Sequence, residues 1–458
     1  RSTLFPYTTL FRSNQRGIVN ITVIGAGYVG IVTCACFSKM GNKVYCVDID
    51  NQKINNLKNN IMPIYEPNLK TLVKECQNKN DLLFTNNLKE ALDDSNIIFI
   101  AVGTPMDDDG SVNLDYIFSA ARDIANNITR DSLVVVKSTV PVGTCFKIKK
   151  YIENILDEKN SSVKINIASN PEFLKEGNAI EDCLHPDRVI IGCDNYEIYE
   201  ILKDLYSSFV LNHDRFIFMD IKSAEMTKYV SNAMLATKIS FMNEIANICD
   251  VTGVNIKNIR LGVGSDKRIG YDYIYSGCGY GGSCFSKDVR ALIKTAENNG
   301  YRTNILPNVE MVNKKQKMLL IRKIVDKFGE DLSALNFAIW GLSFKPDTDD
   351  VREATSLVVI SEIIKKGGKV KVYDPKAQSE FKKEISNDYL SSIEFTNNRY
   401  DALNDCDALV LITEWKEFRN PDFDILSKRL KRKIIFDGRN IYNKRIINLG
   451  FELYQIGC

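Results

Sequence analysis

Histidine is scarce in this chain, which has 458 residues and only two histidines, His185 and His213. A Ser-His-Asp triad or a histidine general base would have to use one of these two, and neither has a second histidine nearby. The sequence also contains no HExxH and no CxxC, so it offers no spacing that is typical of a zinc site. We therefore expect no metal site, and chemistry that depends on Cys, Lys, Asp, Glu or a cofactor.

Long apolar runs and an excess of charge of one sign are absent as well. No stretch approaches the ~20 apolar residues that a membrane-spanning helix needs. Lys plus Arg (60) nearly balance Asp plus Glu (58), so neither a membrane nor a nucleic-acid partner is indicated. The 12 cysteines are scattered without regular spacing, which is typical of reduced thiols and predicts a cytoplasmic protein.

The first residues show no signal-peptide or amphipathic pattern. Residues 1–13 (RSTLFPYTTLFRS) resemble the translation of a sequencing-adapter primer. We expect residues 1–16 to be an artefact or a disordered tail, and the native protein to begin near Gly17.

Short β-branched stretches alternate with helical stretches in two separate parts of the chain. The expected strands are at 18–24, 43–47, 97–102, 133–136 and 164–168, and then at 337–340, 369–373, 408–412 and 433–436. Such alternation predicts parallel, doubly wound sheets. Residues 222–251, between the two series, contain no Pro or Gly and repeat apolar residues such as Val230 and Met234 at helical spacing, which predicts a well-buried helix. The expected fold is α/β, with two doubly wound Rossmann-like domains joined by a long central helix.

Gly25, Gly27 and Gly30 follow the first expected strand in the pattern GAGYVG and open a predicted helix. In dinucleotide-binding folds the first glycine makes a tight turn, the second lets the backbone approach a pyrophosphate, and the third lets helix and strand pack closely. Asp48 ends the second strand, about 20 residues further on, where an acid binds a ribose 2′-hydroxyl and repels a 2′-phosphate. NAD is therefore favoured over NADP, although the motif alone also fits FAD.

Segment 277–288 (GCGYGGSCFSKD) places Cys284 after a glycine-rich loop and just before a predicted helix at 288–299. At a helix N-terminus the dipole lowers a thiol pKa, and backbone N–H groups can hold an oxyanion. Most cysteines are inert and buried, so local context leaves Cys284 open between a nucleophile and a structural residue. We expect a purely structural role for Cys34, Cys36, Cys46, Cys76 and Cys249.

Two further groups of polar residues allow both a functional and a structural interpretation. Lys228 and Asn232 are four residues apart and so share one face of the long helix, but a solvated pair of Glu225 with Lys228 would explain the lysine equally well. Glu172 and Glu176 follow a predicted strand, at the edge where α/β sites form. Surface acids beside a loop are the alternative.

Ten motifs together resemble the UDP-glucose 6-dehydrogenases, within the nucleotide-sugar dehydrogenases, from about residue 18 to residue 439. The most specific is GYGGSCFSKDV at 279–289. The others are GAGYVG (25–30), PIYEPNL (63–69), VGTP (102–105), KSTVPVGT (137–144), NPEFLKEGNAI (170–180), HPDRVIIG (185–192), the Lys228 and Asn232 helix, FKPDTDDVRE (344–353) and DGRN (437–440).

The resemblance implies that the C6 alcohol of UDP-glucose is oxidised twice, with two NAD reduced and UDP-glucuronate, a precursor for polysaccharide biosynthesis, as the product. Cys284 is implied as the nucleophile that adds to the bound aldehyde, so that a thiohemiacetal and then a thioester form on it. Lys228 and Asn232 match the pair that stabilises the oxyanion, and Asp288 matches a carboxylate that works with the lysine and a water.

The remaining site residues are also carried over from the resemblance. Glu172 matches the acid that promotes hydrolysis through a water held by Thr139. The cofactor-binding residues are expected to be Gly25, Gly27, Tyr28, Val29, Gly30, Asp48, Lys53, Thr104, Thr139, Glu176, Lys287 and Arg352. The substrate-binding residues are expected to be Glu172, Phe173, Leu174, Lys175, Lys228, Asn232, Arg268, Tyr280, Gly281, Lys345 and Arg439, with Tyr280 at a position that is usually Phe.

The resemblance also implies three domains and a homo-oligomer. The expected domains are an NAD-binding Rossmann domain at 17–215, a central helical dimerisation region at 216–330 that carries the cysteine loop, and a UDP-sugar-binding α/β domain at 331–458. Arg268 matches an arginine that reaches into a neighbouring subunit's site, which implies a homodimer or a higher homo-oligomer with the long helix at its core.

Three other functions are open to such a sequence. A GDP-mannose 6-dehydrogenase would use the same chemistry, but NPEFLKEG, HPDRVIIG and Phe285 after the cysteine look more like the UDP-glucose branch. The branch that oxidises N-acetylated sugars typically has other sequences in place of NPEF and GGSCF. An inactive protein that only binds NAD and a nucleotide sugar would not need its reactive residues intact. An alcohol dehydrogenase that stops at the aldehyde would not need Cys284.

Overall fold

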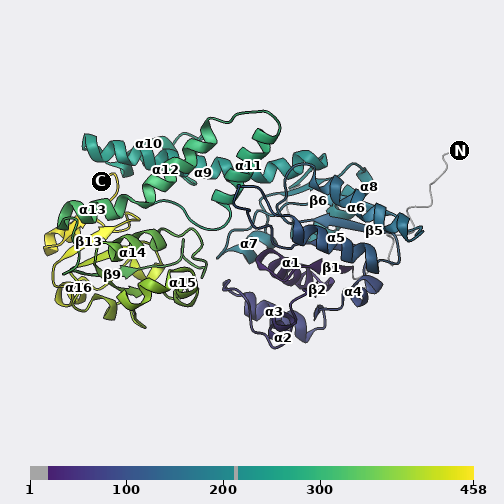
Figure 1. Ribbon diagram of the computed structural model, residues 1–458, viewed down its shortest axis with the longest axis horizontal. Coiled ribbons are helices and arrows are strands. Elements are labelled where there is room, and N and C mark those ends of the chain that lie inside the picture. Colours follow the sequence, from purple (N-terminus) through teal and green to yellow (C-terminus); the bar gives the residue numbers. More distant parts are fainter. Residues whose placement is uncertain (1–18, 211–214) are drawn as a thin grey trace. The chain divides into compact units, whose positions relative to one another are not determined.

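The computed structural model describes residues 19–210 and 215–458, so the expectations for residues 1–16, for Gly17 and for His213 lie outside the described residues. The chain forms two compact units, which meet in sequence between Val230 and Ser231 (Figure 1). We call them unit 1 and unit 2 and describe each by itself. The expected division into three domains stays a prediction.

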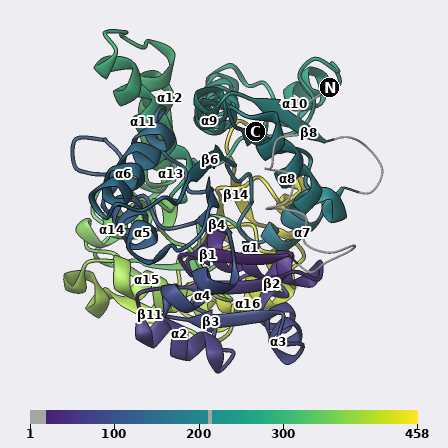
Figure 2. The ribbon, with the colours of Figure 1, turned by 90° about the vertical axis from the view of Figure 1, so that its right-hand side faces the viewer.

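Unit 1 contains an eight-stranded sheet in the order β3-β2-β1-β4-β5-β6-β7-β8, in which β1, β2 and β3 lie side by side (Figure 2). Its strands are β1 (Asn20–Ile24), β2 (Lys43–Val47), β3 (Leu82–Thr85), β4 (Ile97–Ile100), β5 (Ser132–Val136), β6 (Ile165–Ser169), β7 (Val189–Gly192) and β8 (Phe216–Met219). The first six strands are parallel, whereas β7 is antiparallel to β6 and parallel to β8. The strand order reverses between β1 and β4, which is where ligands bind in open α/β sheets.

Helices connect these strands and cover the sheet of unit 1. They are α1 (Tyr28–Lys39), α2 (Asn51–Lys58), α3 (Leu69–Asn78), α4 (Leu88–Asp94), α5 (Asp115–Asn127), α6 (Thr144–Glu158), α7 (Ala179–Leu184) and α8 (Tyr196–Tyr206), with a short 3-10 turn at Ser207–Phe209. Strand residues alternate between two hydrophobic clusters: Ile97 and Phe99 of β4 belong to one, Ile98 and Ile100 to the other. A parallel sheet buried on both faces explains the nearly continuous apolar runs of the sequence.

Unit 2 contains a six-stranded, all-parallel sheet in the order β11-β10-β9-β12-β13-β14. Its strands are β9 (Asn336–Trp340), β10 (Lys369–Tyr373), β11 (Ile393–Phe395), β12 (Ala408–Leu411), β13 (Ile434–Asp437) and β14 (Glu452–Tyr454). Its helices after α9 are α10 (Ile256–Gly264), α11 (Phe285–Asn298), α12 (Ile305–Lys317), α13 (Leu319–Phe328), α14 (Thr355–Lys365), α15 (Gln378–Glu384) and α16 (Phe423–Arg429), with 3-10 turns at Asn387–Ser392, Asp401–Leu403, Lys416–Phe418 and Lys444–Leu449. Trp340, at the end of β9, is fully buried and stacks on Phe418.

The long helix α9 spans Ile221–Thr252 and carries the chain from unit 1 into unit 2. The expected fold class, two parallel α/β sheets joined by a long helix, is therefore confirmed. The prediction that α9 is well buried is wrong for one of its faces, because Val230 and Met234 are 46% and 59% exposed. Helical spacing places apolar residues on a face but does not say whether that face is covered within the same chain. Within residues 19–210 and 215–458, no helix has both the length and the apolar character needed to cross a bilayer.

Candidate active site

The turn between β1 and α1 has the geometry of a diphosphate cradle. Gly25 has a φ of +106°, and a Cβ there would lie 2.7 Å from the Ala101 carbonyl oxygen. A Cβ at Gly30 would lie 1.8 Å from the Gly25 carbonyl oxygen, whereas one at Gly27 would meet nothing within 4 Å. The first and third glycines thus pack the turn, and the second leaves open space at the N-terminus of α1. No acidic residue lies in the first turn of α1, so its partial positive charge can attract an anion.

Asp48 and Lys53, both expected near the cofactor, lie together at this turn. The buried Asp48 carboxylate accepts hydrogen bonds from Ala26 N (2.8 Å), Asp50 N (3.0 Å) and Lys53 Nζ (2.9 Å). Burial alone would raise the pKa of Asp48, but these N–H donors and the Lys53 charge lower it overall. Asp48 is therefore an ionised acceptor at the end of β2, as binding of a ribose hydroxyl requires.

Thr104 and Thr139 follow β4 and β5, and both are half-buried. Because β1, β4 and β5 are parallel neighbours, these threonines lie at the same edge of the sheet as the glycine turn. Tyr28 and Val29, in the first turn of α1, are half-buried as well. Unit 1 therefore places most of the expected cofactor residues along one edge.

Glu66, which sequence reasoning missed, joins the glycine turn to the loop that carries Glu176. The buried Glu66 carboxylate accepts from the Tyr28 hydroxyl and from the backbone N–H groups of Gly177 (2.6 Å) and Ala179 (2.8 Å). These two N–H groups stand at the start of α7, so Glu66 caps that helix from a distant part of the chain. The motif PIYEPNL, which contains Glu66, was the only sequence signal for this role.

Glu172 and Lys228 form a buried ion pair, with 2.8 Å between Oε1 and Nζ. The second Glu172 oxygen accepts from Leu174 N at 2.6 Å, and Nζ of Lys228 lies 5.4 Å from the centre of the Phe173 ring. Burial acts to raise the pKa of Glu172, but the Lys228 charge and these hydrogen bonds lower it overall. The carboxylate is therefore held ionised, as a base must be.

The alternative of a solvated pair between Glu225 and Lys228 is wrong. Glu225 is buried, and its carboxylate accepts from Gly143 N and Cys145 N at the start of α6. Lys228 is also buried and pairs with Glu172, which lies 56 residues away in sequence. Sequence spacing could not reveal either partner, because both are brought in by the fold.

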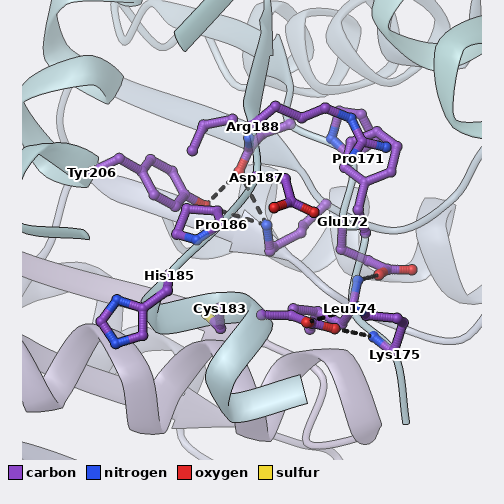
Figure 3. A pocket seen from close by; sticks show the side chains of 15 residues that line it. Pro171, Glu172, Leu174, Lys175, Cys183, His185, Pro186, Asp187, Arg188 and Tyr206 are labelled. Atoms are coloured by element: carbon purple, nitrogen blue, oxygen red, sulfur yellow. Dashed lines mark hydrogen bonds and ion pairs between the residues drawn. The ribbon is translucent and has the colours of Figure 1, made fainter. Parts of the chain in front are cut away.

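A cavity of about 150 Å³ lies between the loop that carries Glu172 and the segment that follows α7 (Figure 3). Lys137, Asn170 and Tyr206 line it and form a buried triad. Lys137 Nζ donates to Asn170 Oδ1 and to the Tyr206 hydroxyl oxygen, both at 3.2 Å, and the Tyr206 hydroxyl donates to Asn170 Oδ1 at 2.6 Å. Lys175, which also lines the cavity, is exposed and pairs with Asp182 at 3.3 Å. Sequence reasoning missed this triad.

In unit 2, Cys284 is the residue immediately before helix α11, and its side chain is exposed. The prediction of a cysteine at a helix N-terminus is confirmed, although the helix begins at Phe285, three residues earlier than expected. The five cysteines expected to be structural are all buried, as predicted: Cys34, Cys36, Cys46, Cys76 and Cys249. Accessibility and helix position thus distinguish Cys284 from them.

Asp288 lies on α11, one turn after Cys284, and is almost completely buried. It accepts a hydrogen bond from Asn232 Nδ2 of α9 at 2.6 Å, and Lys287 Nζ lies 3.1 Å from its other oxygen. Lys228 and Asn232 are four residues apart on α9, which is about one turn of the helix. Each of these two α9 side chains therefore has a buried carboxylate as its partner.

The glycine-rich loop before Cys284 is held in place by side chains of unit 2. Tyr280 is buried and donates from its hydroxyl to Glu310 Oε1 at 2.8 Å, so the hydroxyl that distinguishes it from Phe has an acceptor. Gly281, the next residue, is also buried. Arg439 donates from Nη1 to the Gly279 carbonyl oxygen at 3.2 Å and therefore lies at this loop; its role in substrate binding stays a prediction.

The other expected residues of unit 2 are less enclosed. Lys345 is half-buried beside the Phe344 ring, with 5.3 Å between Nζ and the ring centre. Arg352 and Arg268 are exposed and each forms a two-pronged ion pair with an acid two residues earlier, Asp350 and Asp266. The side chain of Arg268 is 88% exposed. Among the residues that the structure describes, no cluster of three or more His, Cys, Asp or Glu side chains is arranged to hold a metal ion.

Comparison with known proteins places one family along nearly the whole chain. Residues 19–210 match the NAD binding domain of the UDP-glucose/GDP-mannose dehydrogenase family, residues 222–315 match its central domain, and residues 338–444 match its UDP binding domain. A UDP-glucose 6-dehydrogenase of Pseudomonas aeruginosa is 45% identical over 96% of this chain and 97% of its own length. One from Rhizobium meliloti is 41% identical over 96% of this chain and 99% of its own length.

Solved structures agree with this assignment. A UDP-glucose dehydrogenase from Pyrobaculum islandicum is similar with a TM-score of 0.87 and 33% identity, covering 97% of this chain and 99% of its own. A UDP-D-ManNAc dehydrogenase from Pyrococcus horikoshii has a TM-score of 0.82 and 26% identity, covering 95% of this chain and 99% of its own.

Proposed function

Because the chain belongs to the UDP-glucose/GDP-mannose dehydrogenase family, we propose that it oxidises UDP-glucose to UDP-glucuronate with two molecules of NAD. The observation that carries this proposal is the exposed thiol of Cys284 at the N-terminus of α11, one turn from Asp288. An aldehyde carbon cannot transfer a hydride until a nucleophile has added to its carbonyl group. Such a thiol is therefore needed only if the oxidation continues from the aldehyde to the acid.

Unit 1 supplies most of the residues assigned to NAD. The open space at Gly27 and the N-terminus of α1 fit a diphosphate, and the ionised Asp48 fits a ribose 2′-hydroxyl. When bound, NAD accepts a hydride from C6 in each of the two oxidations. Further contacts are assigned to Tyr28, Val29, Lys53, Thr104, Thr139, Glu176, Lys287 and Arg352.

In the first oxidation, Lys228 and Asn232 stabilise the C6 oxygen as it loses its proton. Both are N–H donors on the same turn of α9, so they can direct hydrogen bonds to one oxygen. Asp288 receives the proton through a water. Asn232 is already oriented by its hydrogen bond to Asp288, which limits the rearrangement needed when substrate binds.

In the second oxidation, the Cys284 thiolate forms a C–S bond to the aldehyde carbon, and the carbonyl oxygen becomes an alkoxide held by the same two donors. Loss of the second hydride from C6 leaves a thioester on Cys284. Glu172 then takes a proton from a water that Thr139 holds, the water adds to the thioester carbon, and the C–S bond breaks to release a carboxylate and the thiolate. One water and two NAD are consumed for each sugar.

UDP is assigned to the loop before Cys284 and to the basic residues of unit 2. The Tyr280–Gly281 segment supplies the Gly281 N–H group, because the Tyr280 N–H donates to Asn313 Oδ1. Lys345 and Arg439 supply positive charge. The sugar is assigned to the segment Glu172, Phe173, Leu174 and Lys175 together with Lys228 and Asn232. Because a single pocket discriminates sugars by only a few contacts, substrate choice is the part of the proposal that most needs measurement.

We further propose that the active form is at least a homodimer, with α9 in the interface. Four apolar residues, Val230, Met234, Phe241 and Ile248, recur on one face of α9 at intervals of four or seven, and each is at least 46% exposed in the single chain. A repeat of this kind is typical of helix pairing. The exposed Arg268 is then available to a neighbouring subunit.

The test is a stoichiometric assay with purified protein. UDP-glucose, GDP-mannose and UDP-N-acetylglucosamine are each supplied in limiting amount with excess NAD, and NADH and the sugar product are quantified. We expect two NADH for each UDP-glucose and a carboxylate as the product. One NADH for each sugar with free aldehyde would overturn the proposal, and faster turnover of GDP-mannose would reassign the substrate.

A further inference from the structure

Lys137 is a buried cation to which the proposed reaction assigns no task. It follows β5, is 7% exposed, and donates to two neutral acceptors, Asn170 and Tyr206. Burying an ammonium group is energetically unfavourable unless its surroundings compensate for the lost hydration. Two neutral oxygens compensate only in part, so a nearby negative charge is the partner that such a site favours.

Among the carboxylates of the proposed reaction, Glu172 is the one that shares a cavity with Lys137. Both side chains line the same cavity, and Asn170, which accepts from Lys137, lies two residues before Glu172. The backbone N–H of Asn170 donates to the Val136 carbonyl oxygen, and its side-chain amide donates to the Ile190 carbonyl oxygen. The triad therefore fixes the start of the segment that carries Glu172.

The Glu172 carboxylate has different partners at different stages of the proposed reaction. Before substrate binds, Lys228 pairs with it at 2.8 Å. When an oxyanion forms, Lys228 must direct its N–H groups to that oxygen, and the pair with Glu172 weakens. A carboxylate that is 92% buried would then take up a proton unless a second cation remained nearby.

We propose that Lys137 is a positioning residue for Glu172, which holds this carboxylate in place and ionised during hydrolysis of the thioester on Cys284. The inference rests on the proposed function, because it assigns Glu172 the task of base in that step. The proposed reaction assigns Lys137 no contact with the substrate or with the hydrolytic water. It acts through its charge and through Asn170.

Other charged groups around Glu172 are less able to do this. Lys228 faces it from α9, and Lys175 is exposed and paired with Asp182. The remaining titratable side chains on the cavity wall are Cys183, His185, Asp187, Arg188 and Tyr206. Arg188 stacks on the Phe173 ring, with 3.8 Å from its guanidinium carbon to the ring centre, so its charge is engaged there.

The principal test compares Lys137→Gln with the wild-type enzyme over a range of pH. Gln keeps an N–H donor for Asn170 and Tyr206 but removes the charge. We expect the acidic limb of the kcat profile to move upward by about one pH unit, which is about a tenfold loss of kcat on that limb, with KM for UDP-glucose changed less than twofold.

A rapid-mixing experiment on the same variant identifies the affected step. If hydrolysis alone is slowed, two NADH per active site form in a burst before a slow steady state, because both hydride transfers precede hydrolysis. Tyr206→Phe removes the two hydrogen bonds of the Tyr206 hydroxyl but keeps the charge of Lys137, and His185→Gln changes another wall of the cavity. His185→Gln should keep the wild-type limb and show no burst. Tyr206→Phe should keep the wild-type limb, because the charge of Lys137 remains.

Three results would decide against the inference or its premise. An unchanged pH profile without a burst in Lys137→Gln would overturn the role of Lys137. A lower kcat without a burst in Lys137→Gln would place Lys137 in an earlier step and would also overturn it. If Lys137→Gln proves unstable, Lys137→Met also removes the charge, and Tyr206→Phe then controls for the lost hydrogen bond to Tyr206. Failure of the wild-type enzyme to form two NADH per UDP-glucose would instead refute the proposed function.

Discussion

Gly27 and Gly30 lie three residues apart in the turn that opens α1, yet a side chain would meet very different surroundings at the two positions. At Gly30 a Cβ would overlap the Gly25 carbonyl group at 1.8 Å, and at Gly27 it would point into open space. Within this one motif, Gly30 is therefore required for packing, whereas Gly27 leaves room for a ligand.

Substitution of these two glycines by alanine should separate stability from cofactor binding. Gly30→Ala should destabilise the protein by about 3 kcal/mol, because backbone must move to relieve the clash. Gly27→Ala should fold normally but bind NAD at least tenfold more weakly, because the methyl group occupies space assigned to the diphosphate. Thermal unfolding and NAD titration measure the two effects, and equal loss of stability in both variants would contradict this interpretation.

Cys284 differs from most other cysteines of the chain in its accessibility. It precedes α11 with an exposed side chain, whereas Cys34, Cys36 and Cys46 are completely buried in unit 1. Brief treatment of the native protein with iodoacetamide should therefore modify Cys284 first and abolish formation of UDP-glucuronate, as mass spectrometry of peptides and an activity assay would show.

The matched control for this labelling is Cys284→Ala. That variant should lose turnover to the acid and should resist the first equivalent of reagent. Full conversion of UDP-glucose to the acid by Cys284→Ala would show that the thiol is structural. Faster labelling of the half-buried Cys183 than of Cys284 would show that exposure does not govern reactivity here.

Single residues also show where sequence reasoning ends. The glycine turn and Cys284 could be predicted because their roles depend on neighbours within a few residues. The partners of Lys228 and Glu225 could not, because Glu172 and the start of α6 reach them from 56 and about 80 residues away. A charged residue that is buried by tertiary structure looks the same in sequence as one on a solvated surface.

At the scale of elements, the predictions were most accurate for long or strongly apolar segments. Strands β2 and β10 have the predicted bounds, and α9 begins and ends within one residue of its prediction. Strands β3, β7, β8, β11 and β14, with three or four residues each, were missed. Hydrogen bonding to neighbours in the sheet defines such short strands, and a local pattern cannot supply it.

The apolar face of α9 makes a specific prediction about assembly. Phe241 is 57% exposed in the middle of this face, so Phe241→Asp should convert the proposed dimer to monomer. The control is Tyr116→Asp on α5, which adds the same charge at an aromatic residue with 55% exposure outside α9. Analytical ultracentrifugation would measure the mass, and a Phe241→Asp protein that stays dimeric would place the interface elsewhere.

At the scale of the whole molecule, the two sheets share one strand order. In both, the first strand of the series lies beside the second and the fourth, so the order reads 3-2-1-4-5-6, followed in unit 1 by β7 and β8. The sequence predicted two similar α/β halves but not this identity of order, because pairing of distant strands is not encoded locally. The glycine turn after β1 distinguishes the half that we assign to NAD.

The two buried tryptophans give this division a practical consequence. Trp340 and Trp415 are the only tryptophans of the chain, and both belong to the core of unit 2, where their indole N–H groups donate to Arg399 O and to Asp374 Oδ2. Tryptophan emission excited at the red edge of the absorption band should therefore report the unfolding of unit 2 and not the melting of the sheet that carries the glycine turn.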